Sequence, residues 1–122
     1  MQHDQNPKPT ELRVSKDKRE LTIGFANGDR FTIPAELLRV QSPSAEVQGH
    51  SPEQRKLIFG KRNVEILQIL PTGNYAVRIV FDDMHDTGIF TWSYLHEMGS
   101  DVNGRMAAYE AELKEKGLKR ER

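Results

Sequence analysis

The sequence of 122 residues contains no cysteine. This absence excludes disulfide bonds, thiolate nucleophiles and any zinc or iron–sulfur site that depends on cysteine ligands. It is compatible with a reducing compartment. Residues 1–10 also lack the apolar segment that a signal peptide needs, so we expect a cytoplasmic protein.

Long hydrophobic runs and an excess of charge of one sign are absent as well. No apolar segment approaches the roughly 20 residues of a membrane-spanning helix, so we expect no association with a membrane. The 18 lysines and arginines balance the 18 aspartates and glutamates, which gives a formal net charge of zero. A neutral chain has no long-range attraction to nucleic acid, and we predict no nucleic-acid partner.

Recognisable catalytic motifs are also missing. Gly60-Lys61 does not form a phosphate-binding loop, because Arg62 follows where serine or threonine is required. The sequence has no GxSxG or HExxH segment, and no histidine has an acidic residue two positions later, as an iron-binding triad requires. We therefore expect a protein without catalytic activity. A small enzyme with an unrecognised site is the least favoured alternative.

Apolar residues that alternate with polar ones predict several short, half-buried β-strands. The clearest of these strands runs from Tyr75 to Phe81. The other predicted strands contain Leu12 and Val14; Leu21, Ile23 and Phe25; Phe31 and Ile33; Val64, Ile66 and Ile69; and Ile89 to Thr91. The alternation shifts near Leu67, which predicts a bulge or burial on both faces.

The dipeptide Asn27-Gly28 predicts a hairpin between the second and third of these strands. A two-residue loop would put the apolar rows of the two strands on opposite faces. A three-residue loop at residues 26–28 sets Phe31 beside Ile23 and keeps both rows on one face. Gly28 then occupies the left-handed position that favours glycine.

Three helical segments complete the predicted elements. Pro34–Arg39 begins with a proline, which suits the first helical turn. Trp92–Met98 ends at Gly99, and a longer helix from about Asn103 to Lys116 ends at Gly117. We expect the basic residues after this last glycine to be frayed.

These elements predict an α+β fold, a small β-rich domain of antiparallel strands and hairpins with short helices and a C-terminal helix. We divide the chain into a flexible N-terminal tail at residues 1–10, a domain at residues 11–100, and the C-terminal helix with its basic tail at residues 101–122.

A long connection, residues 41–63, interrupts the predicted strands. Its Ser-Pro steps and glycines prevent long regular elements, and connections of this length are often functional. His50 could serve there as a base or a ligand, although a hydrogen bond to the backbone is the favoured role. Arg55, Lys61 and Arg62 could receive a phosphate or an acidic partner, although an ordinary solvated surface is the favoured explanation.

The segment at residues 82–86 contains three aspartates and a histidine. Imidazole and carboxylate groups can bind a divalent metal ion, so His85, Asp83, Asp86 and the more distant His50 are candidate metal ligands. The alternative is a solvated loop whose aspartates accept hydrogen bonds from turn amides. Residue types alone favour this second reading.

Three ordered segments resemble a single family. They are SPSAEVQGH at residues 42–50, GKRNV at residues 60–64, and the stretch from GNYAVRI at residue 73 through His85, Thr87-Gly88-Ile89 and Trp92-Ser93-Tyr94-Leu95. Together they are similar to the gamma-butyrobetaine hydroxylase-like N-terminal domain family in its standalone bacterial form, over roughly Leu12 to Gly99. The resemblance implies a β-rich α+β domain that is not itself an oxygenase.

The resemblance also bears on the metal question. In the carnitine-pathway enzymes of this family, the domain holds a zinc ion with three cysteines and one histidine, and the matching histidine is His85. Because this chain has no cysteine, the family's zinc site cannot be complete, and no cofactor is certain. Met84 stands where the family usually has glycine, which would strain the turn if that position is left-handed.

We therefore predict a non-catalytic binding or accessory domain with a protein partner. The resemblance connects such a partner with iron–sulfur or metal handling, or with a 2-oxoglutarate oxygenase. The loops of His50 and His85 would form the working surface, with Arg55, Lys61 and Arg62 as further partner-binding candidates. A metal-binding domain that uses zinc or another divalent ion is the alternative.

Overall fold

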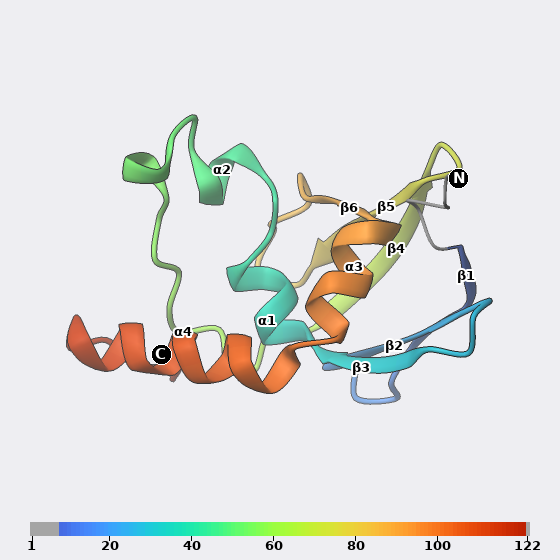
Figure 1. Ribbon diagram of the computed structural model, residues 1–122. Helices are drawn as coiled ribbons and strands as arrows, with labels where there is room; N and C mark the ends of the chain where they lie inside the picture. The colour runs from blue at the N-terminus through green and yellow to red at the C-terminus, as the bar shows by residue number, and fades with distance from the viewer. Residues whose placement is uncertain (1–7, 122) are drawn as a thin grey trace, which may run out of the picture.

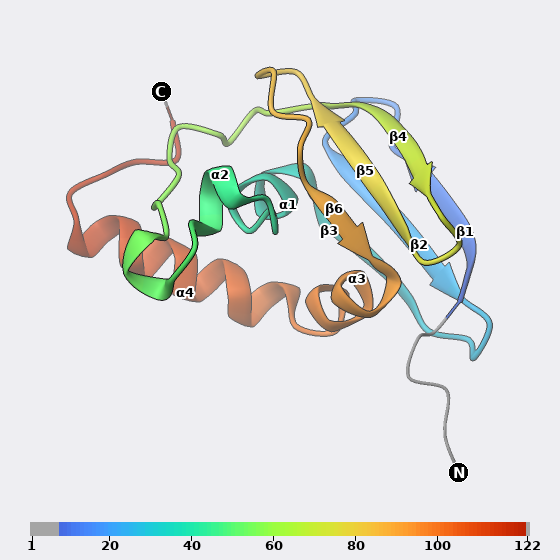
Figure 2. The same ribbon diagram turned by 90° about the horizontal axis from the view of Figure 1, so that it is seen from above.

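Two three-stranded antiparallel sheets and four α-helices make up the computed structural model, which describes residues 8–121. The elements in chain order are β1 (Pro9–Val14), β2 (Glu20–Phe25), β3 (Arg30–Pro34), α1 (Ala35–Val40), α2 (Ala45–Gln48), a 3₁₀ turn (Pro52–Gln54), β4 (Ile66–Thr72), β5 (Ala76–Phe81), β6 (Ile89–Thr91), α3 (Trp92–Gly99) and α4 (Val102–Glu115). Figures 1 and 2 show the two sheets on one side of the molecule and the helices gathered on the other. The predicted α+β fold is confirmed.

The first sheet has the strand order β1-β2-β3, and its second hairpin has the predicted register. Ile23 pairs with Phe31 and Leu21 pairs with Ile33, as a three-residue loop requires. Gly28 has a φ of 97°, which is the left-handed conformation that glycine adopts without strain. Both apolar rows consequently face the core.

The second sheet has the order β4-β5-β6, and it contains the predicted bulge. The pairing of β4 with β5 shifts between Ile66 and Gln68, and the extra residue, Leu67, is 53% exposed. A bulge of this kind changes which face the following side chains occupy. Tyr75 lies in the turn before β5 rather than in the strand itself.

One hydrophobic core joins both sheets to three of the helices. It contains the inward side chains of β2, β3 and β5 together with residues from α1, α3 and α4. The largest fully buried side chains are Phe81, Phe90, Leu21, Ile23, Ile33, Leu37, Leu38, Ile66, Ile79, Leu95, Met98 and Val47. The burial of these aliphatic and aromatic groups is the main source of stability, at about 1.5–3 kcal/mol for each.

The three predicted helices lie close to their predicted bounds, and the short helix α2 in the long connection was not predicted. Helix α4 begins and ends one residue earlier than expected, and Gly117 follows it with a φ of 69°. Pro34 is the last residue of β3 and directly precedes α1, rather than being the first helical residue. Strand β1 starts at Pro9, inside the predicted tail at residues 1–10, and residues 1–7 of that tail lie outside the described residues. Within residues 8–121, no helix is long and apolar enough to cross a membrane.

The expectation of a frayed end after α4 is wrong for residues 118–121. Leu118 packs against the core, and the segment that follows it runs beside the long connection. The amide of Gly60 donates to the carbonyl of Lys119 at 3.1 Å, and the amide of Arg62 donates to the carbonyl of Arg120 at 3.1 Å. The sequence offered no sign of this pairing, because the segment has no apolar alternation.

A partly buried ion pair between Arg120 and Glu36 also holds the C-terminal segment, residues 118–121, in place. The carboxylate of Glu36, on α1, is 4% exposed and accepts hydrogen bonds from Arg120 Nε at 3.0 Å and Nη2 at 2.7 Å. The planar guanidinium matches a carboxylate in this two-contact geometry. Burial of Glu36 therefore depends on a residue 84 positions later in the chain.

We expect Arg120→Ala to lower the free energy of unfolding by about 2 kcal/mol, because it leaves the buried Glu36 carboxylate without its counter-charge. Arg62→Ala is a matched control, since it removes an ion pair with Glu121 in which both side chains are about half exposed. That change is expected to cost less than about 0.5 kcal/mol. Urea denaturation of the two variants measures the difference, and equal losses would contradict the prediction.

Candidate functional site

The loop between β5 and β6, residues 82–88, turns tightly and is here called the histidine loop. The amide of Phe81 donates to the carbonyl of His85 at 2.9 Å, and the amide of Met84 donates to the carbonyl of Phe81. Asp82 exchanges two hydrogen bonds with the backbone of Glu65, which precedes β4. The loop is therefore held at its base by backbone contacts on both sides.

The side chain of His85 points into the protein and is only 2% exposed. Its Nδ1 lies 3.0 Å from Glu46 Oε1, and its Nε2 lies 2.9 Å from Ser42 Oγ. A carboxylate can only accept, so Nδ1 carries the proton, and Nε2 of the neutral ring accepts from the Ser42 hydroxyl. Both ring nitrogens of His85 thus have partners within the protein.

The environment of His85 favours the neutral ring. Burial, the largest influence, and the positive charge of Arg39 lower the pKa of the imidazole, while Glu46 and Asp83 oppose that change. The net effect is a pKa below the usual value for histidine. A neutral ring is what the observed hydrogen bonds require.

Asp83 anchors the histidine loop by charge. Its Oδ2 lies 2.7 Å from Arg39 Nε and 2.7 Å from Lys61 Nζ, and its Oδ1 accepts from the amide of His85 at 3.2 Å. Burial alone would raise the pKa of Asp83, but the hydrogen bonds from Lys61 and Arg39 outweigh it, and the pKa lies below its usual value. Arg39 comes from α1 and Lys61 from the long connection, so this carboxylate joins three segments.

The long connection packs directly against the histidine loop. Ser42 is fully buried, and a Cβ added to Gly88 would lie 2.3 Å from its Oγ, so only glycine fits opposite it. Ser44 caps α2 by accepting from the amide of Glu46, and its hydroxyl lies 2.6 Å from Thr87 Oγ1. Residues 42–46 and the histidine loop therefore form one interlocked unit.

Ser42, His85 and Glu46 have the atom order of a hydrolase triad, with serine at Nε2 and a carboxylate at Nδ1. A nucleophile must, however, reach a substrate, and Ser42 has no exposed surface and faces Gly88 at close range. The geometry thus supports a structural role for these three residues. The hydrogen bonds among these residues connect the long connection to the histidine loop, and they do not activate the Ser42 hydroxyl for attack.

Most of the four candidate metal ligands are engaged by other protein groups. Asp83 binds two cationic side chains, and Asp86 faces Arg78 at 3.7 Å. His50 is exposed, and its amide donates to Gln54 Oε1 at 2.8 Å. Among residues 8–121, no group of three or more histidine, aspartate or glutamate side chains is arranged to hold a metal ion.

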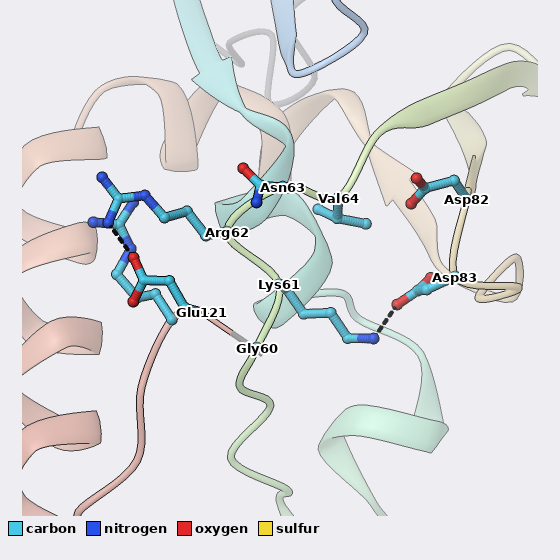
Figure 3. A pocket seen from close by; sticks show the side chains of 9 residues that line it. Gly60, Lys61, Arg62, Asn63, Val64, Asp82, Asp83 and Glu121 are labelled. Atoms are coloured by element: carbon cyan, nitrogen blue, oxygen red, sulfur yellow. Dashed lines mark hydrogen bonds and ion pairs between the residues drawn. The ribbon is translucent and has the colours of Figure 1, made fainter.

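The candidate partner-binding cations are all paired with carboxylates. Arg55 pairs with Glu112 of α4, Lys61 with Asp83, and Arg62 with Glu121. Figure 3 shows Lys61 and Arg62 pointing away from each other, toward their separate partners, along the wall of a cavity of about 160 Å³. These residues therefore fasten the long connection and do not form an open basic patch.

Met84 occupies the tip of the histidine loop in an unusual conformation. Its φ is 75°, in the left-handed region, and its side chain is the most exposed of the large hydrophobic ones described, at 89%. The sequence predicted backbone strain at Met84 if its backbone is left-handed. The structure shows that it is left-handed. A residue with a side chain costs roughly 1–2 kcal/mol in this conformation.

Ser42 and Glu46 are the main residues that the sequence did not reveal. Only Ser44 had a local signal, since serine directly before a helix with an acidic residue in its first turn is typical of a helix N-terminus. Ser42 is 43 positions from His85, and no periodicity connects them.

We expect stability to fall as the pH drops below about 6.5, because unfolding restores His85 to its ordinary pKa and the unfolded chain then binds an extra proton. The folded pKa is lowered, so stability rises with pH across this window and levels off above it. Thermal unfolding of the native protein and of His85→Gln between about pH 5 and 7 measures the effect. The variant should show a flatter dependence on pH, and parallel curves would contradict the assignment.

We also expect Gly88→Ala to lower the free energy of unfolding by about 1–3 kcal/mol, because its Cβ would overlap Ser42 Oγ. Gly24→Ala is the control, since a Cβ there would meet its nearest atom, in Glu11, at an ordinary 3.4 Å. Chemical denaturation of both variants should show a loss for the first change alone.

Comparisons with known proteins agree with this architecture. Two solved structures, each described as an NMR solution structure, are 42% and 43% identical to this chain, cover 95% and 98% of it and 91% and 89% of their own length, and have a TM-score of 0.82. A crystal structure of a protein of unknown function from Acidithiobacillus ferrooxidans ATCC 23270, described as a member of the DUF971 family, is 33% identical, covers 80% of this chain and 98% of its own, and has a TM-score of 0.66.

A search of curated proteins found no match. The family model described as "Gamma-butyrobetaine hydroxylase-like, N-terminal" matches residues 12–96. These residues include both sheets except the start of β1, the long connection and the histidine loop, and they end within α3. The chain therefore belongs to the gamma-butyrobetaine hydroxylase-like N-terminal domain family.

Proposed function

We propose that this protein is a non-catalytic accessory domain that binds a partner protein through the tip of the histidine loop. The observation that carries the proposal is Met84, a large apolar side chain held almost fully in solvent by a strained backbone. Strained residues in rigid surroundings tend to cluster where a protein binds. Glycine would relieve the strain, but it would also remove the apolar group available for contact.

The two residues that flank Met84, Asp83 and His85, are fixed by contacts with the rest of the protein. Asp83, on one side, binds two cations, and His85, on the other, is buried with both ring nitrogens bonded. A side chain presented by a pre-ordered loop loses little conformational freedom when it binds, so more of the contact energy remains for affinity. Methionine also adapts its shape to an apolar pocket in a partner.

A second exposed apolar side chain lies on the neighbouring segment. Phe59 is 51% exposed. It lies two residues before Lys61, and the ammonium group of Lys61 contacts Asp83. The ion pair thus brings the segment of Phe59 to the histidine loop. Aromatic and methionine side chains are enriched at protein interfaces, which supports a protein as the partner.

The alternative functions have less support. The residues that suggested metal binding bond to protein groups, and the triad-like set around His85 is buried. Membership of the family favours a partner in iron–sulfur or metal handling, or a 2-oxoglutarate oxygenase. In this proposal the partner binds to the histidine loop, which the sequence analysis also selected. The buried imidazole of His85 holds this loop in place and does not contact the partner.

Photo-crosslinking in the cells that produce the protein tests the proposal. A photoreactive amino acid at position 84 should capture one protein partner, which mass spectrometry then identifies. The same group at position 18 is a matched control. Lys18 is exposed, and with a φ of 66° it is, apart from Met84, the one non-glycine residue among those described that has a left-handed backbone. Equal labelling from both positions, or none from position 84, would overturn it.

We expect Met84→Gly to separate stability from binding. Relief of strain should leave the free energy of unfolding unchanged or raise it by up to about 1 kcal/mol, while affinity for the captured partner falls at least about tenfold. Lys18→Gly should relieve strain similarly without loss of affinity. Calorimetric titration and urea denaturation measure the two quantities, and unchanged affinity in Met84→Gly would refute the role of this side chain.

A further inference from the structure

A separate cavity lies between the long connection and helix α4, away from the tip of the histidine loop. Both views show the connection passing alongside α4 (Figures 1 and 2). A cavity of about 320 Å³ is lined by residues of both segments. It is here called the arginine cavity. Pockets for small molecules have volumes from roughly 300 Å³ upward.

The polar part of this lining has an excess of positive charge. Arg55 and Arg105 both line the cavity, and Glu112, the single carboxylate in the lining, already pairs with Arg55. Arg105 Nη1 donates to Gln41 Oε1 at 2.7 Å, and its Nη2 contacts Glu97 at 2.7 Å. Since Glu97 is 68% exposed, solvent screens this last contact and weakens its hold on the guanidinium.

Arg105 also has one hydrogen-bond donor without an acceptor. Its Nε is buried and makes no hydrogen bond, although an unsatisfied donor of this kind costs about 1–3 kcal/mol. The guanidinium lies 5.8 Å from the centre of the Tyr94 ring, which keeps it against the wall of the cavity.

Apolar side chains form part of the remaining lining of the arginine cavity, beside the amides of Gln41 and Gln48. Val40, Leu57, Ile58 and Ala108 line it, together with the rings of two tyrosines. The hydroxyl groups of these tyrosines donate to the carbonyls of Gln41 and Ile58, so they are occupied. The cavity thus combines a cationic end with a hydrocarbon wall.

We propose that the arginine cavity binds a small organic anion, with its oxyanion head at Arg105 and its hydrocarbon body against Leu57 and Ile58. The charge excess and the free donor at Arg105 favour the head, and the apolar wall favours the body. This site shares no lining residue with the histidine loop, so the inference goes beyond partner binding and does not depend on it.

Hexanoate is a suitable probe, because it joins a carboxylate to a short alkyl chain. In NMR titrations of the full chain, it should shift the amide signals of Leu57, Ile58 and Ala108, with a dissociation constant of about 1 mM or below. Hexanol, which has the chain alone, and phosphate, which has the charge alone, should each bind at least about tenfold more weakly. No shift with hexanoate, or equal binding of either control compound, would overturn the proposal.

Two neighbouring alanines on α4 provide matched variants. Ala107 and Ala108 are both exposed, but only Ala108 lines the cavity. Ala108→Phe should fill the site and abolish the hexanoate shifts, whereas Ala107→Phe should leave them intact. Arg105→Gln should weaken binding at least about tenfold by removal of the charge. Equal behaviour of the two alanine variants would contradict the assignment, even if Arg105→Gln proved too unstable to measure.

Discussion

The buried imidazole of His85 joins two irregular segments that contain most of the functional candidates of this domain. Its two hydrogen bonds, to Ser42 and Glu46, fix the start of the long connection against the histidine loop. The neutral state of the ring is essential, because only that state accepts from Ser42 while donating to Glu46. Burial favours the neutral state because it lowers the pKa of the His85 imidazole. Met84 directly precedes His85 in the chain, so this contact also fixes the loop that carries Met84, together with the start of the long connection. In this domain, therefore, the residue that looked most reactive in the sequence determines the shape of the surface.

Much of the fold could be predicted from the sequence, because each strand buries one face and therefore alternates. The register of the second hairpin followed from the requirement that Ile23 and Phe31 share a face, and α4 was located to within one residue by its helical spacing and the glycine after it. The bulge at Leu67 was visible as a change of phase. Each of these signals is local. Alternation, helical spacing and turn residues all act within a few positions, which is the range over which one sequence can be interpreted directly.

The candidate site could be predicted only in part, because its contacts join residues far apart in the chain. His85 was identified by type, and the possible strain at Met84 was inferred, but the partners of both loops lie about 40 positions away. Cations that looked like a surface patch proved to be paired, for example Arg55 with Glu112, 57 positions later. A formal net charge of zero is compatible with many such pairings and specifies none of them. The Ser42–His85 contact has no pattern in the sequence, and only the three-dimensional structure shows it.

The pairing of the long connection with the C-terminal segment has a consequence for the order of folding. Gly60 and Arg62 obtain their backbone partners from residues 119 and 120, and Ile58 receives a hydrogen bond from Tyr109. During synthesis, both sheets can form as soon as residues up to β6 have left the ribosome, but the middle of the connection must wait for about 30 more residues. At the usual rates of translation this interval lasts seconds. In that interval Leu57 and Ile58 are uncovered, so the nascent chain passes through a stage in which this segment is the part most open to proteases and chaperones.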